Sequence, residues 1–196
     1  MTAGLVISSR PRPDQPFSAK RLEKVFNQCF TRRWRTRLVG GASEPLYQPA
    51  AEGADEHLLF YRCDYFASAL HEVAHWCIAG ARRREQVDFG YWYAPEGRSA
   101  AQQQAFEAVE YKPQALEWWF ARACGYRFRV SLDNLDAQAG TIPDSGPLAR
   151  RILAQALFWQ RSGLPGRAGI FVTALSKEFG TRLEPGRLRF SLSELS

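Results

Sequence analysis

Apolar residues recur every three to four positions in several stretches of this chain, which is the spacing of one helix face. The first stretch follows Ser18, a residue suited to capping a helix, and continues to about Thr31. Its apolar positions are Leu22, Val25, Phe26, Cys29 and Phe30. The same spacing predicts further helices over residues 64–79, 99–123, 146–160 and 165–179. Pro113 lies inside one of them, so we expect that helix to kink or break there.

Shorter apolar or alternating runs between the helices predict strands. They cover residues 34–39, 57–61 and 86–93, with one more at 126–131 in an otherwise irregular stretch. Residues 42–56 are rich in turn-forming residues and are expected to be loop. This alternation of strands and helices predicts a single α+β domain.

The predicted domain occupies residues 18–180. Residues 1–17 contain three prolines and little periodicity, so we expect a flexible N-terminal arm. Residues 181–196 are predicted to form a C-terminal tail. A chain of 196 residues is long enough for one domain with its own hydrophobic core.

The composition is that of an ordinary globular protein, with 45% hydrophobic and 23% charged residues. No apolar run is long enough to span a membrane, and the first residues do not resemble a secretory signal. The four cysteines form no CxxC pair and are interpreted as reduced, buried thiols. We therefore expect a cytoplasmic protein with no membrane partner.

The formal net charge is +6, and nearly all of the basic residues are arginines. This charge favours an acidic protein or a nucleic acid as partner. The arginines are scattered along the sequence and do not form the dense stripe of a phosphate-binding surface. Direct binding of nucleic acid is therefore not expected.

Two of the three histidines stand in the short motif HEVAH, as His71 and His75, with Glu72 between them. On a helix, residues four apart project from the same face, so both imidazoles can reach one divalent cation. The third histidine, His57, stands alone and is expected to serve the structure only. The motif therefore predicts a metal site on the helix over 64–79.

A third ligand is expected from the long helix over 99–123, which carries three glutamates on one face. These are Glu107, Glu110 and Glu117. We predict that Glu110 is the ligand, with Glu107 as its rival, and that whichever of these two does not bind the metal orients a histidine.

Two histidines and one carboxylate are the ligand set of oxygen-activating Fe(II) sites and also of hydrolytic Zn(II) sites. With zinc, Glu72 would be the general base of a metallopeptidase; with iron, it would be a proton relay or a supporting residue. A binding module with a structural metal is the third interpretation. It is disfavoured because no cysteine has ligand spacing.

The block HEVAHWCIAGARRREQVDFGYWYAPEGR, followed by QQQAFEAVEYKPQALEWWF, resembles the elongation factor P hydroxylase family. The similarity extends to EPLYQPA before these blocks and to GYRFRVSLDNL after them, and it covers roughly residues 18–180. Usual 2-oxoglutarate oxygenases carry an HxD motif, which is absent from this sequence.

The resemblance implies an enzyme that hydroxylates a lysine of translation elongation factor P already modified with a β-lysyl group. It implies Fe(II) held by His71, His75 and Glu110, with Glu72 as the motif glutamate. It implies a zincin-like pair of helices packed with a small mixed sheet. A zinc metallopeptidase remains the alternative. The arginines expected to dock the substrate are Arg82, Arg83, Arg84 and Arg98, and the aromatic residues expected to line its cleft are Tyr91, Trp92 and Tyr93.

Overall fold

We analysed a computed structural model, which describes residues 16–88, 99–132 and 145–195. Within these ranges the chain forms five α-helices and three strands. The strands are β1 (Thr36–Ala42), β2 (Leu46–Gln48) and β3 (His57–Arg62). The helices are α1 (Ala19–Trp34), α2 (Phe66–Ile78), α3 (Ala100–Cys124), α4 (Gly146–Ser162) and α5 (Gly166–Phe179). This arrangement confirms the predicted α+β class; the likeness to a zincin helix pair stays a prediction.

The sheet is small and mixed, with strand order β1-β3-β2. The central strand β3 pairs in parallel with β1 and antiparallel with β2. Leu59 of β3 lies between Leu38 on one side and Tyr47 on the other, and all three side chains are buried. Tyr47 also pairs with Asp88 through two backbone hydrogen bonds, which places the chain after α2 against the edge of the sheet.

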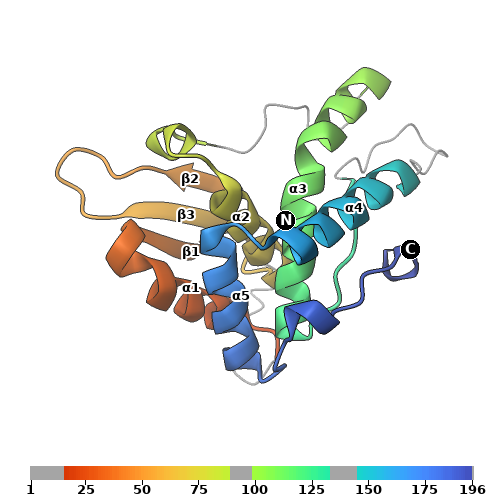
Figure 1. The fold of residues 1–196 in the computed structure, drawn as a ribbon. Helices are drawn as coiled ribbons and strands as arrows, with labels where there is room; N and C mark the ends of the chain where they lie inside the picture. The colour runs from red at the N-terminus through yellow and green to blue at the C-terminus, as the bar shows by residue number, and fades with distance from the viewer. Residues whose placement is uncertain (1–15, 89–98, 133–144, 196) are drawn as a thin grey trace, which may run out of the picture.

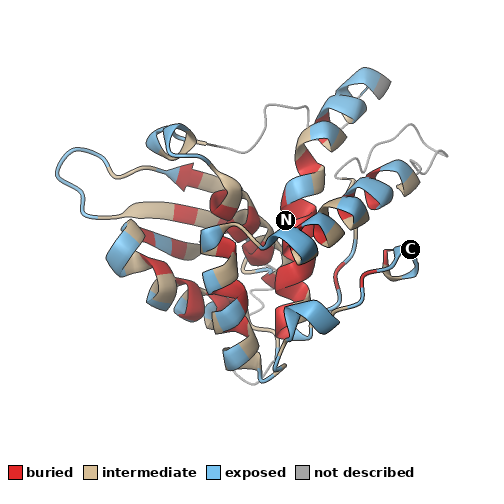
Figure 2. Ribbon diagram, viewed as in Figure 1, coloured by how far each residue is buried: buried red, intermediate tan, exposed pale blue. Residues whose placement is uncertain are grey.

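The helices gather beside the sheet, with α1 along it and the long α3 next to α2 on the side away from the strands (Figure 1). Buried residues concentrate where α1, α2, α3 and α5 meet, as Figure 2 shows. Aromatic rings fill this junction: Phe26, Phe30, Trp76, Phe120 and Phe171. Each fully buried Phe stabilises the fold by about 1.5–3 kcal/mol, so this cluster anchors α2 firmly.

Three details of the secondary structure differ from the prediction. β2 forms in the stretch expected to be loop, because its pairing with β3 outweighs the flanking prolines. Residues 126–131 form no strand, since no sheet edge pairs with them. α3 runs unbroken through Pro113, which is buried, so packing outweighs the cost of about 3 kcal/mol for a proline inside a helix.

The predicted strand over 86–93 lies mostly outside the described residues, as do most of the predicted N-terminal arm and the residues Tyr91, Trp92, Tyr93 and Arg98. Residues 181–195 contain two short 3₁₀ turns, at Pro185–Arg187 and Leu192–Glu194. Phe190 and Leu195 from this segment are buried, and Phe190 packs on Trp118 of α3 at 4.6 Å between ring centroids. No helix in the described ranges has the length and apolar character needed to cross a membrane.

Cys77 and Cys124 are buried, and all four cysteines are free thiols, as predicted. Cys63 is exposed and Cys29 is only partly buried, which corrects the prediction that every thiol is buried. The reason is local: Cys63 follows β3 in a turn, with a φ of 50° that carries the chain out of the sheet.

Candidate metal centre

The helix α2 holds His71 and His75 on one face. Its opposite face is apolar and fully buried in the core, through Leu70, Val73 and Ala74. This packing fixes the rotation of the helix, and the two imidazoles point to the same side. Their Nε2 atoms lie 3.0 Å apart.

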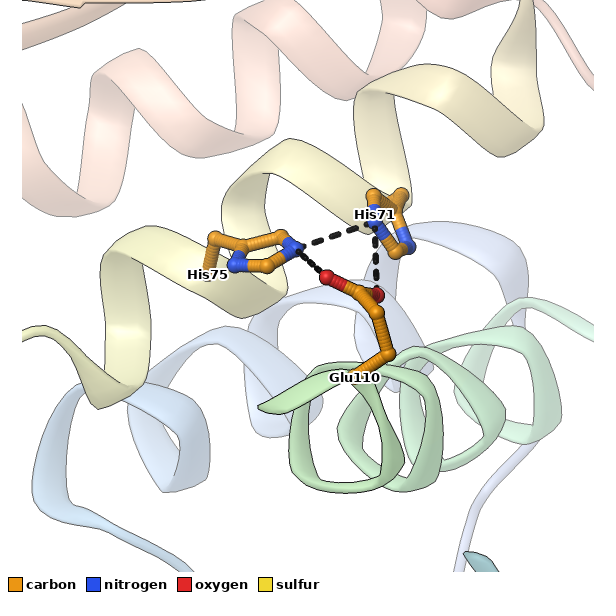
Figure 3. Close-up of side chains that lie close together, drawn as sticks. All are labelled: His71, His75 and Glu110. Atoms are coloured by element: carbon orange, nitrogen blue, oxygen red, sulfur yellow. Dashed lines mark hydrogen bonds and ion pairs between the residues drawn. The ribbon is translucent and has the colours of Figure 1, made fainter. Parts of the chain in front are cut away.

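The helix α3 brings Glu110 against both imidazoles, as Figure 3 shows. Its Oε1 lies 3.2 Å from His75 Nε2, and its Oε2 lies 3.5 Å from His71 Nε2. Glu110 is only 1% exposed. The three side chains form a group whose ligand atoms all lie within 4.8 Å of one another, which is the group that the sequence predicts. Their metal binding stays a prediction.

The geometry of this group fits a divalent cation. When two ligand atoms each lie about 2.1 Å from a metal ion and their bonds meet at a right angle, the two atoms are about 3.0 Å apart. The distances between the ligand atoms of these three side chains are close to that value. Glu110 Oε2 is buried and has no hydrogen-bond partner, an arrangement that is costly unless a cation or proton satisfies it. Two imidazole nitrogens and a carboxylate oxygen are also a donor set that first-row metals favour.

Glu117 supports the site from two turns further along α3. Its Oε2 lies 2.9 Å from His71 Nδ1, so it accepts a hydrogen bond from the N–H of that ring nitrogen. The proton is thereby held on Nδ1, and the lone pair of Nε2 faces Glu110 and His75. Sequence analysis placed Glu117 on the correct face of the helix but did not assign it this contact.

These contacts shift the pKa values of His71 and Glu110. Burial disfavours the charged form of His71, but the hydrogen bond to Glu117 and the charge of Glu110 outweigh burial and raise the pKa of His71 well above its ordinary value. Burial also acts to raise the pKa of Glu110, yet His75 and His71 hold that pKa down at about 2. Without metal, His71 therefore tends to hold a proton while Glu110 is ionised, and a metal ion that binds Nε2 of His71 has to displace that proton.

Glu72, the predicted catalytic residue, lies outside the group of three. Together with His75 and Trp76 it lines a cavity of about 30 Å³, which is large enough for a water molecule. Burial raises the pKa of Glu72, and the neighbouring Glu110 and Glu117 add to the rise, partly offset by the two histidines. Its role in catalysis stays a prediction.

Glu107, the rival ligand, is not in the group, and the role of orienting a histidine that was expected of it belongs to Glu117. Glu107 Oε1 accepts a hydrogen bond of 3.2 Å from Gln103 on the preceding turn. His57 accepts a hydrogen bond of 2.8 Å from the backbone N–H of Ala50 at Nδ1 and stacks on Tyr47, which fits the expected structural role.

The arginines after α2 are engaged locally. Arg83 forms an ion pair with Asp88, and Arg84 donates a hydrogen bond to the carbonyl of Ala79. Arg82 lies in the same short 3₁₀ helix. These contacts hold the chain leaving α2 beside the cavity that contains Glu72.

Arg167 of α5 is a residue that sequence analysis missed. Its Nη2 donates to the carbonyls of Trp76, Cys77 and Ala79 at 2.9, 3.0 and 2.6 Å, and its guanidinium lies over the Trp76 ring. It therefore satisfies carbonyls at the C-terminal end of the helix that carries His75. No local pattern in the sequence could have indicated this contact.

Comparison with known proteins agrees with the resemblance noted in the sequence. The profile of one protein family, described as elongation factor P hydroxylase, matches residues 25–187. A protein of Haemophilus influenzae named elongation factor P lysine hydroxylase is 41% identical over 169 residues. That alignment covers 86% of this chain and 93% of the relative. The chain described here belongs to the elongation factor P hydroxylase family.

Proposed function

We propose that this protein hydroxylates a lysine side chain of elongation factor P that already carries a β-lysyl group. The name of the relative supports the substrate and the reaction class. The observation that carries the proposal is the convergence of His71, His75 and Glu110 in a family of hydroxylases. Fe(II) is the metal we propose, because two histidines and one carboxylate are the ligand set of non-haem iron oxygenases.

When bound, iron would supply the redox chemistry that activates dioxygen, so that one oxygen atom enters a C–H bond while an external two-electron donor reduces the other atom to water. The protein's own side chains would hold and orient it. His71 and His75 offer their Nε2 atoms, and Glu110 offers a carboxylate that is already ionised. Glu117 fixes the tautomer of His71.

The exposed part of the group of three lies on its histidines. His71 and His75 keep 20% and 18% of their side-chain surface exposed, whereas Glu110 beneath them keeps 1%. A lysine carrying a long extension can therefore approach from the histidine side. Glu72 lies next to His75 at the small cavity, where its carboxyl group can hold or pass a proton.

The test is the intact mass of elongation factor P after incubation with this protein, Fe(II), dioxygen and a chemical reductant. We expect a gain of one oxygen atom on the β-lysylated factor, and no gain with His71→Ala or His75→Ala. Glu107→Ala is the matched control and should retain activity, because Glu107 lies outside the group. Full activity of either histidine variant would refute the site. Zinc-dependent peptide cleavage that Glu72→Gln abolishes would instead support the metallopeptidase.

A further inference from the structure

A groove of about 790 Å³ lies at the far end of α3 from the proposed metal centre. Residues 125–128 form one wall, residues 181–184 form part of the other, and Arg122 of α3 contributes to its lining. A hydrogen bond of 2.8 Å from Thr181 to the carbonyl of Ala123 ties the two walls together. The groove is separate from the metal centre, since Arg122 follows Glu110 by three turns, or roughly 18 Å along the helix.

Four arginines and two glutamates line this groove: Arg122, Arg127, Arg182, Arg187, Glu184 and Glu194. Both glutamates are already neutralised by arginines of the groove. Glu194 pairs with Arg122 at 3.1 Å, and Glu184 pairs with Arg187 at 2.8 Å. Two positive charges of the lining are therefore left over.

Those two charges belong to Arg127, after α3, and Arg182, after α5, and both residues line the groove. Both side chains are exposed, and neither makes a hydrogen bond or ion pair with any residue in the described ranges. Arg182 has a φ of 49°, a left-handed conformation that non-glycine residues rarely adopt. Ser176 holds this turn, because its hydroxyl accepts a 2.8 Å hydrogen bond from the backbone N–H of Leu183.

The groove also has an apolar part. Trp118 stacks on Phe128 with 6.0 Å between ring centroids, and both are buried. Leu183, Leu188 and Tyr126 line the groove while only partly buried, so each keeps some apolar surface in contact with solvent. Apolar surface beside uncompensated guanidinium groups is typical of a protein-binding site.

We propose that this groove docks an acidic segment of the protein substrate. A guanidinium group is shaped to bind a carboxylate through two hydrogen bonds, and Arg127 and Arg182 have no carboxylate of their own. Pairing with Glu184 and Glu194 leaves only two uncompensated arginines in the groove, which is fewer than the row of phosphate contacts that binds a nucleic acid. The chain's net charge of +6 has the same sign as the charge of the groove, and both attract an acidic partner.

The identity of the partner rests on the proposed function. A hydroxylase that modifies one side chain of a folded protein gains affinity and specificity from contacts away from that side chain. A standard protein interface covers about 800 Å² per partner, which is wide enough to reach from the metal centre to a groove roughly 18 Å away.

The experiment measures steady-state hydroxylation of β-lysylated elongation factor P by the double variant Arg127→Glu, Arg182→Glu. We expect KM to rise about tenfold at low salt, with kcat within about twofold of wild type, and the difference to shrink as salt is raised. The control is Arg32→Glu, Arg150→Glu, which changes the net charge equally at two exposed arginines outside the groove. The neutral variant Arg127→Gln, Arg182→Gln should give a smaller rise and covers the case in which charge reversal unfolds the protein.

An unchanged KM in both groove variants, with the wild type active, would overturn the docking proposal and leave the proposed function standing. An equal rise in the control variant would also overturn it, because net charge alone would then explain the effect. If single-stranded RNA binds the wild type and loses affinity only in the groove variants, the partner is a nucleic acid and the proposal is wrong. Absence of hydroxylation by the wild type would instead reject the proposed function.

Discussion

Removing the carboxylate of Glu117 should weaken metal binding although Glu117 is not itself a ligand. In the structure Glu117 accepts the Nδ1–H of His71 at 2.9 Å and is only 9% exposed. In Glu117→Ala this N–H loses its acceptor, so His71 is free to rotate or to change tautomer. Its Nε2 lone pair is then no longer fixed toward Glu110 and His75.

The size of the effect follows from the kind of contact. Supporting partners of metal-bound histidines typically contribute 10–100-fold in affinity, which corresponds to about 1.4–2.7 kcal/mol. A buried, charge-assisted hydrogen bond of about 1.5–3 kcal/mol falls in the same range. Glu117→Gln keeps an acceptor oxygen but loses the charge, so its affinity should lie between those of the wild type and Glu117→Ala.

The assay is a competitive titration of Fe(II) or Co(II) against a chelator under anaerobic conditions. Glu107→Ala serves as the matched control, because it removes a carboxylate from the same helix face outside the group of three. The order of affinities should be wild type and Glu107→Ala first, then Glu117→Gln, then Glu117→Ala. If Glu117→Ala binds the metal as tightly as the wild type, the orienting role is refuted.

Three further outcomes are expected from thermal unfolding. Arg167→Met should lower the free energy of unfolding by about 1–3 kcal/mol, because the carbonyls at the end of α2, including that of Trp76, lose their donor. An unchanged Tm would contradict this. Gly40→Ala should lower the free energy of unfolding by about 1–3 kcal/mol, because a Cβ there would overlap the carboxylate of Asp64. Gly41→Asn should lower it less, because a Cβ at Gly41 meets no other atom. Metal at about 100 times its Kd should raise Tm by about 5–10 °C over chelator-treated protein, and Glu110→Gln should reduce this shift strongly.

The helices were predictable because their signal is local. One apolar face at helical spacing was enough to place α1, α2, α4 and α5 to within a few residues of their observed ends. β2 was not predictable, because three residues between prolines form a strand only when β3 is available to pair with them. The contribution of Phe190 to the core depends in the same way on distant partners such as Trp118.

The sequence indicated which residues form the candidate site, but not every contact that these residues make. The spacing of HEVAH placed His71 and His75 together, since both lie on one helix. Glu107, Glu110 and Glu117 share one face of α3, and the crossing point of α2 decides which of them reaches the histidines. That crossing point is set by packing in the core, which the local sequence pattern does not encode.

The central claim is that His71, His75 and Glu110 bind one divalent metal ion together. Crystals grown with Fe(II) under anaerobic conditions would test it through anomalous scattering at the iron edge. We expect a single peak about 2.0–2.2 Å from Nε2 of both histidines and from a carboxylate oxygen of Glu110. A peak bound by other residues, or no peak at this group in protein that contains iron, would contradict it.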